Sequence, residues 1–247
     1  MGWPTLRSVR GTLVALVMLP TGIVSAQQGV TTLGVQLKPV IPVSYFDPTI
    51  TVQREHLTGT VTLDGGMAFG MNVRIGLTKM LSIETGLGQI TRRYTFALAN
   101  DTNAYSESSE VRYVGYELPV ALLVYLRLGE KSYMNAALGL SVDFYPSDVQ
   151  RDLEEGRIYI YRNRWAQLGA LGNLGVEYRT DKSGIFYAGT TFHRPFNAMA
   201  TADLTYYDRG RGFFPYDMRG SLSGAYLTLD LRYYFHEDPE RIRRKKK

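Results

Sequence analysis

Eight segments of the chain alternate between apolar and polar residues with a period of two, and no other sequence feature restricts the fold as strongly. In the clearest segment, the odd-numbered residues from Ala225 to Phe235 are apolar or aromatic, whereas the even-numbered series includes Asp230 and Arg232. Because successive side chains of a β-strand point to opposite faces, each segment predicts a strand with one apolar face. The eight segments are 33–43, 67–77, 81–88, 114–128, 134–144, 166–178, 185–192 and 225–235.

The connections between these segments alternate strictly in length. The short ones, typical of tight turns, are 78–80, 129–131 and 180–184. The long ones, which are polar, are 46–60, 98–110, 146–160 and 197–220. An even number of strands also returns both ends of a barrel to one side. We therefore expect an all-β fold, an eight-stranded antiparallel up-and-down transmembrane β-barrel with short periplasmic turns and long external loops.

The alternation alone does not decide which face points outward. A soluble eight-stranded barrel of the lipocalin type would enclose the apolar series around a ligand. A membrane barrel is favoured because the polar series is rich in glycine and alanine, which suits a crowded lumen, and because several segments reach the 9–11 residues of a tilted membrane strand. Aromatic residues near the ends of the apolar series, as in interfacial girdles, are Phe144, Tyr178, Tyr233 and Phe235.

The two ends of the chain carry its excess of positive charge, which is +5 overall. Arginines precede an apolar run at 11–19, and Val24-Ser25-Ala26 has the small residues that a signal peptidase reads, so we expect a signal peptide at 1–26. Residues 236–247 form a basic tail that we place in the periplasm. The barrel itself, 27–235, then has equal numbers of acidic and basic residues, so we expect no nucleic-acid partner.

The predicted lumen contains four cations and five anions. They are Lys38, Arg74, Glu84, Glu117, Arg127, Asp143, Glu177, Asp230 and Arg232. Side chains nearly fill the interior of an eight-stranded barrel, and isolated buried charges are costly. We therefore expect these residues to form a salt-bridged plug. The alternative is a narrow ion or solute channel, for which large lumenal side chains such as Arg127 leave little room.

Few residues could carry catalytic chemistry. His193 lies near the outer end of its segment, a place that resembles the catalytic position of the outer-membrane lipid A deacylases, in which a nucleophilic serine follows the histidine by two residues. Position 195 is proline here, and only the distant Ser221 or Ser223 could replace that serine. We therefore expect a rim histidine and no enzymatic activity, with a lipid A-modifying enzyme as the alternative.

Metal and cofactor sites are not expected either. The chain has no cysteine, which excludes disulfides, thiolate zinc sites, iron–sulfur clusters and thiol nucleophiles. The other two histidines, His56 and His236, fall in a loop and in the tail without a ligand partner at metal spacing.

The long connections are rich in arginine and aromatic residues, which mark contact surfaces. The candidate contacts are Tyr161, Arg164, Arg211, Phe213, Phe214 and Tyr216. This composition also suits a barrel wall among the phosphates of lipopolysaccharide. We expect outer-membrane lipid and lipopolysaccharide as surroundings, with an envelope protein as a further candidate partner.

One stretch resembles a known family. The run from Tyr116 to Tyr125, followed after a short turn by the run from Tyr133 to Gly139, is similar to the PorT-like outer-membrane β-barrel family of Bacteroidota. The resemblance extends loosely over 30–235. It implies an eight-stranded barrel in the outer membrane of a Gram-negative bacterium. The founding member of that family is linked to the type IX secretion and gliding apparatus, and most of its relatives have no assigned activity.

Taken together, these observations predict a monomeric outer-membrane barrel without enzymatic activity. Its role would be structural, adhesive or accessory to secretion, and would be exerted through the external loops. The alternatives are a lipid A-modifying enzyme, a narrow channel and a soluble ligand-binding barrel.

Overall fold

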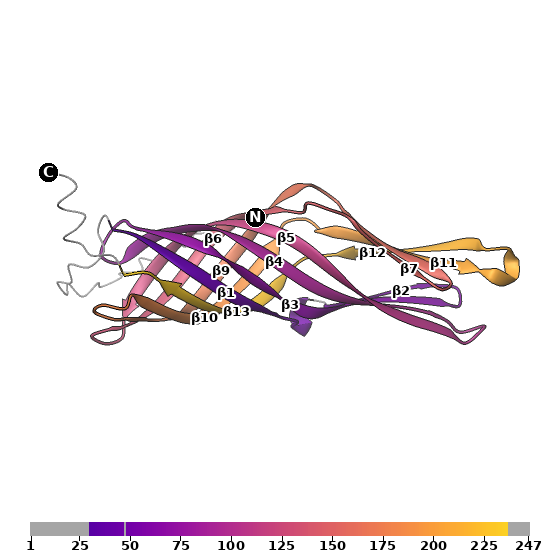
Figure 1. Cartoon of the computed structure of the whole chain (residues 1–247), viewed down its shortest axis with the longest axis horizontal. Coiled ribbons are helices and arrows are strands. Elements are labelled where there is room, and N and C mark those ends of the chain that lie inside the picture. The colour runs from indigo at the N-terminus through magenta and orange to yellow at the C-terminus, as the bar shows by residue number, and fades with distance from the viewer. Residues whose placement is uncertain (1–29, 47, 237–247) are drawn as a thin grey trace, which may run out of the picture.

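The computed structural model describes residues 30–46 and 48–236. These residues form thirteen β-strands and two short 3-10 helices. The predicted signal peptide, and the basic tail beyond His236, lie outside the described residues. No helix among the described residues is long and apolar enough to cross a membrane. The strands run along one long axis, with a barrel at one end and a narrower extension at the other (Figure 1).

Eight strands form a closed antiparallel barrel, as predicted. Strand β1 pairs with both β13 and β3, and this double pairing closes the ring. Each alternating segment of the sequence falls on one of these strands, and the three short connections join them as tight turns. The barrel strands are β1 (Thr31–Ile41), β3 (Leu57–Gly76), β4 (Leu81–Asn100), β5 (Tyr105–Arg127), β6 (Ser132–Phe144), β9 (Ala166–Arg179), β10 (Ile185–Pro195) and β13 (Tyr226–Tyr234).

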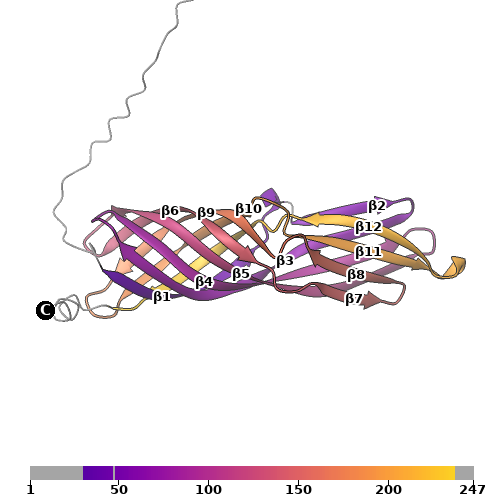
Figure 2. The same ribbon diagram turned by 90° about the horizontal axis from the view of Figure 1, so that it is seen from above.

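The four long connections are not loops, and this part of the prediction is wrong. Strands β3, β4 and β5 continue well beyond the predicted segments, and β2 pairs with β3. The remaining four strands form a separate sheet in the order β12-β11-β8-β7, which faces the extended strands (Figure 2). The additional elements are β2 (Thr49–Arg54), β7 (Val149–Leu153), β8 (Gly156–Arg162), β11 (Ala200–Asp208) and β12 (Phe214–Leu222), with η1 (Ser44–Phe46) and η2 (Arg209–Arg211).

The extension has an apolar interior. Phe96, Ile160 and Leu204 are each fully buried in it, together with aromatic residues such as Tyr113. The strands of the second sheet, which supply one side of this core, are only 5 to 9 residues long. Their apolar residues alternate with charged or hydroxyl-bearing ones, so their sequence resembles polar loops. Because it has this buried apolar core, the extension is a folded structure with an interior of its own.

The barrel has the opposite arrangement. Its apolar series points outward, with Leu126 53% and Leu138 77% exposed, whereas polar and charged residues fill the interior. This is the orientation predicted for a membrane barrel, and a lipocalin-type barrel would have the reverse. The two interiors meet where β3 carries a β-bulge between Leu63 and Gly65, at which its inward series changes from odd-numbered to even-numbered residues.

Candidate functional site

An ion-pair network fills the part of the barrel lumen nearest the short turns. Arg74 is 2% exposed and contacts two carboxylates: its Nε donates to Glu84 at 3.1 Å, and its Nη1 donates to Glu177 at 2.9 Å. Tyr234 donates a hydrogen bond of 2.6 Å to Glu84 and lies with its ring 3.9 Å from the Arg74 guanidinium carbon. This group crosses the lumen from β3 to β4, β9 and β13.

A second part of the network is built around Arg232 of β13. Its guanidinium pairs with both Glu84 and Asp230. Asp230 also accepts hydrogen bonds from Thr191, Thr228 and Asn173. These buried carboxylates are therefore neutralised by arginines and hydrogen-bonded, as buried charges must be.

The structure brings together most of the predicted lumen residues. Eight of the nine are buried inside the barrel. Arg127 is not among them: it is the last residue of β5, it is exposed, and its Nε donates to the Gly129 carbonyl at 2.9 Å. The strand ends there, so the side chain leaves the lumen at the rim.

Two arginines of the lumen were missed. Arg92 is 2% exposed on β4, beyond the predicted end of that strand. Arg179 pairs with Glu177 at the end of β9. The even-numbered inward series of β4, continued past Gly88, would have identified Arg92.

A separate polar cluster lies in the barrel wall near the seam, which is the level where the barrel meets the extension. Ligand atoms of Glu117, Asp143 and His193 lie within 4.8 Å of one another, and all three residues are buried. His193 Nε2 lies 3.2 Å from Asp143 Oδ2 and 2.8 Å from Ser141 Oγ. His193 is therefore an interior residue, and the expectation of a rim histidine is wrong, because the extension continues the wall beyond it.

The nearest hydroxyl to His193 also differs from the expectation. Ser141 of β6 supplies it, rather than Ser221 or Ser223, because β9 carries only Gly169 between the two side chains. Asp143 and Ser141 both contact Nε2, so the carboxylate does not hold the ring through Nδ1 as in a Ser-His-Asp triad. Ser141 is 1% exposed.

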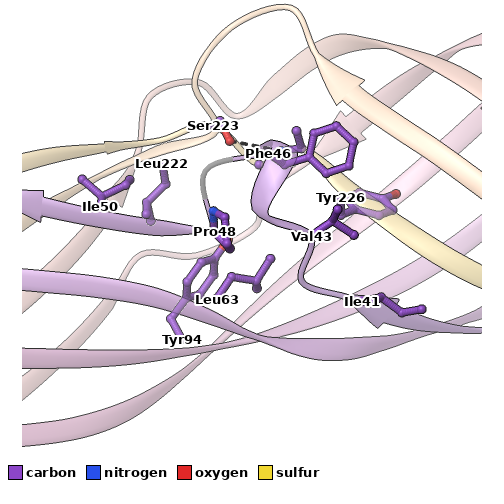
Figure 3. Close-up of a pocket in the computed structure, with 12 residues that line it drawn as sticks. Ile41, Val43, Phe46, Pro48, Ile50, Leu63, Tyr94, Leu222, Ser223 and Tyr226 are labelled. Atoms are coloured by element: carbon purple, nitrogen blue, oxygen red, sulfur yellow. Dashed lines mark hydrogen bonds between the residues drawn. The ribbon is translucent and has the colours of Figure 1, made fainter.

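A small pocket opens at the seam between barrel and extension. Figure 3 shows apolar side chains from the end of β1, from η1 and from β13 around it, with Tyr226 at one wall. Its volume is about 20 Å³, which is room for a single water molecule. The Tyr226 ring stacks on His193 with the centroids 4.7 Å apart, and its hydroxyl donates to Glu117, so Tyr226 separates the pocket from the polar cluster.

The predicted contact residues lie on the extension and at the seam. Phe213 and Phe214 are 64% and 56% exposed at the tip hairpin between β11 and β12, and Arg211 is exposed beside them. Tyr216 is instead buried and accepts a hydrogen bond of 2.8 Å from Arg211. The remaining two predicted residues are Tyr161, which is half-buried, and Arg164, which is exposed.

The tip hairpin has a defined backbone. Gly212 and Phe213 both have positive φ, at 69° and 63°, and the Phe213 amide donates to the Asp208 carbonyl at 2.8 Å. Asp208 also accepts a hydrogen bond from the Gly210 amide at 2.9 Å. A positive φ is rare for phenylalanine and marks a conformation imposed by its surroundings.

The comparisons with known proteins concern the fold. No protein family matches the sequence, and no curated protein matches it either. Among solved structures, the chain is similar to the outer membrane protein OprG from Pseudomonas aeruginosa, with a TM-score of 0.53 and 10% sequence identity over 85% of this chain and 98% of that one. The chain therefore has the fold of an outer-membrane β-barrel. The finer resemblance to the PorT-like family of Bacteroidota stays a prediction.

Proposed function

We propose that the chain is an integral outer-membrane protein of a Gram-negative bacterium, with a plugged barrel that holds an adhesive contact site above the membrane. The observation that carries this proposal is the tip hairpin, where Phe213 and Phe214 are exposed next to arginines at the far end of a folded extension. Exposed aromatic and arginine side chains of this kind dominate binding energy at protein interfaces.

Membrane insertion is supported by the outer face of the barrel. Apolar side chains are exposed on every barrel strand, which only lipid would cover favourably. Exposed aromatic residues border this surface at both ends, with Trp165 on the side of the extension and Tyr178 on the side of the turns.

A plugged barrel is supported by the ion pairs of Arg74 and Arg232, which cross the lumen between opposite walls. The apolar core of the extension follows on the outer side. An open channel would need a continuous wet path through both layers. We therefore favour a role through surface contact over the channel alternative.

The rigidity of the extension supports the adhesive role. A contact residue on a disordered loop loses conformational entropy on binding, whereas the tip is already held by the hairpin backbone and by Tyr216 packed beneath it. The exposed set fits a partner with both apolar and anionic groups, such as lipopolysaccharide or an acidic envelope protein.

The enzyme alternative is less well supported. The contact between Ser141 and His193 supplies a hydroxyl within reach, but both side chains are almost completely buried. A lipid substrate would have to displace Tyr226 to reach them. We accordingly propose no catalytic role.

The test is adhesion of cells that display the protein. Cells of a Gram-negative host lacking its own adhesins would carry the wild type or a variant with Phe213→Ser and Phe214→Ser, and binding to immobilised lipopolysaccharide and to sister cells would be counted. We expect the tip variant to lose about tenfold in binding, the effect of about 1.4 kcal/mol.

The matched control changes two arginines on the outer face of the same extension, Arg93→Ser and Arg112→Ser, which pair across β4 and β5. The control variant should bind like the wild type. Equal binding by tip variant and wild type, with the same heat-shifted gel band showing a folded barrel, would disprove the adhesive role.

A further inference from the structure

Two buried carboxylates in the barrel wall face each other, and among the described residues neither pairs with a lysine or an arginine. Glu117 of β5 and Asp143 of β6 are directly opposite in the antiparallel register, and they are 8% and 4% exposed. Like charges in this position repel each other. The other three lumenal acids, Glu84, Glu177 and Asp230, each pair with an arginine.

The nearby cations do not compensate these two carboxylates directly. Lys38 and Arg92 interact with Glu117 at longer range, but among the described residues neither forms an ion pair or a hydrogen bond with Glu117 or Asp143. Arg92 instead donates to Met199 Sδ at 3.2 Å and lies 4.9 Å from the Tyr226 ring. No lysine or arginine of the described residues therefore lies in direct contact with either carboxylate.

Several buried polar atoms without hydrogen-bond partners belong to the same cluster of residues. Among the described residues, both oxygens of Asp143 and Nδ1 of His193 are buried without a hydrogen-bond partner. Gln167 of β9 lies directly opposite Asp143 in the pairing of β6 with β9, and its amide nitrogen and oxygen also have no partner. Buried polar atoms in a native protein are nearly always satisfied, so a ligand beside Asp143 would explain its two unpaired oxygens.

We propose that Glu117, Asp143 and His193 bind a divalent transition-metal ion of the zinc type in the barrel wall. One imidazole nitrogen and two carboxylates form a donor set that suits zinc and its neighbours in the first transition row. Their two negative charges balance the charge of a divalent ion. Four strands that follow one another around the barrel, in the order β10-β9-β6-β5, supply the three ligands and the uncommitted Gln167 amide.

One ligand–ligand distance already matches a metal site, and the ligand atom of Glu117 lies within 4.8 Å of the other two. Zinc bonds of about 2.0–2.1 Å to nitrogen and oxygen, at a tetrahedral angle, hold two ligand atoms roughly 3.3 Å apart. His193 Nε2 and Asp143 Oδ2 are separated by 3.2 Å. The third ligand, Glu117, accepts a hydrogen bond from the Tyr226 hydroxyl, the kind of outer-shell contact that orients a metal-bound carboxylate.

The site is enclosed by the barrel interior. On the side of the arginine network, a lumenal cavity of about 20 Å³ lies beside Glu117 and Lys38 and has room for one water molecule. Tyr226 covers His193 on the other side. The metal would tie together strands at the level where the plugged barrel meets the extension, and would hold the wall of the seam.

The experiment uses the full mature protein, folded in detergent after removal of metal, with Zn²⁺ as the probe. Isothermal titration and elemental analysis should give one tightly bound zinc per chain. His193→Gln and Asp143→Asn should each weaken binding by more than about 100-fold. The matched control is Asp230→Asn, a buried lumenal carboxylate that belongs to the arginine network and should bind zinc like the wild type.

A second measurement does not depend on the variants folding. Co²⁺ bound to the wild-type protein should show the visible absorption of a low-symmetry site with nitrogen and oxygen ligands only. The proposal is overturned if folded wild-type protein binds no stoichiometric Zn²⁺, or if His193→Gln and Asp143→Asn fold and bind it unchanged.

Discussion

Leu63 and Phe69 of strand β3 are six residues apart, yet Leu63 is 7% exposed and Phe69 is 53% exposed. An even interval in a regular strand would put both on the same face. The bulge between Leu63 and Gly65 changes the parity, because Asp64 and Gly65 together face the position of a single partner, Arg93. One continuous strand thereby supplies the apolar core of the extension and, further on, the lipid-facing surface of the barrel.

The bulge should depend on glycine at position 65. Its φ is +126°, and an added Cβ would lie 3.0 Å from the Val40 carbonyl oxygen. We expect Gly65→Ala to lower the free energy of unfolding by about 1–3 kcal/mol through backbone strain. Urea unfolding in detergent, followed by the heat-dependent gel shift, measures this.

The control for this prediction is Gly129→Ala in the short turn between β5 and β6, where nothing lies within 4 Å of the added Cβ. It should unfold like the wild type. If Gly65→Ala also unfolds like the wild type, the parity change does not need a glycine.

The lumen plug should be sensitive to loss of Arg74. Replacing it with methionine leaves Glu84 and Glu177 with less compensating charge in a buried site, which costs about 3–5 kcal/mol for a broken buried pair. The matched control is Lys131→Met, because Lys131 pairs with Asp181 in an exposed turn and should contribute nothing measurable. Denaturant midpoints compare the two, and equal midpoints would mean that the plug is not a stabilising network.

The barrel was predictable because its signal repeats. All eight strands carry the same two-residue period, and the outward series of Leu227, Leu229 and Leu231 could be read without any knowledge of its neighbours. The extension was not predictable in the same way. Its strands β7 and β8 have only short apolar series, such as Ile158 and Ile160, whose partners come from β11 far along the chain.

The polar cluster required the register as well as the strands. Glu117 and Asp143 were both assigned to the lumen, but their direct opposition follows from the pairing of β5 with β6. His193 was placed at the rim because its segment ended at position 192, whereas the wall continues into the extension. A period of two shows which residues share one face of a strand. It does not show which residues of two neighbouring strands lie opposite each other.

The extension should unfold separately from the barrel when its core is damaged. Phe96 is fully buried there, and Phe96→Ala should cost about 3–5 kcal/mol. Hydrogen exchange should rise in β8, β11 and β12, while the barrel keeps its heat-dependent gel shift. Phe213→Ala, at an exposed position, is the control and should leave exchange unchanged. Uniform acceleration in all strands would show that the two parts unfold as one.

Alkaline pH should weaken the extension through Tyr113. Burial raises the pKa of this phenol to about 12, and Asp148 adds to the shift while Arg92 opposes it. Since the folded pKa is above the ordinary value of about 10, stability is complete below pH 10 and falls as the pH rises toward 12.

Tyr113→Phe isolates this contribution. The Tyr113 hydroxyl has no hydrogen-bond partner among the described residues, so the variant should equal the wild type at pH 8. Above pH 10 it should lose less stability than the wild type. The measurement is urea unfolding across this pH range, with tyrosinate absorbance as a second readout. Parallel curves would show that Tyr113 does not ionise with unfolding.

The position of the outer membrane boundary can be measured through Trp165. Once the predicted signal peptide is removed, Trp165 is the single tryptophan of the chain. It is 65% exposed and packs against Phe144 with the ring centroids 5.2 Å apart, at the end of the apolar barrel surface. An indole ring at the level of the lipid headgroups should be quenched more strongly by lipids brominated near the headgroup than by lipids brominated at the chain end.

Moving the tryptophan to the tip, with Phe213→Trp in a Trp165→Phe background, should abolish quenching because the extension stands in water. Quenching at position 213 would instead place the extension within the bilayer, and the tip could then not serve as a contact site at the cell surface.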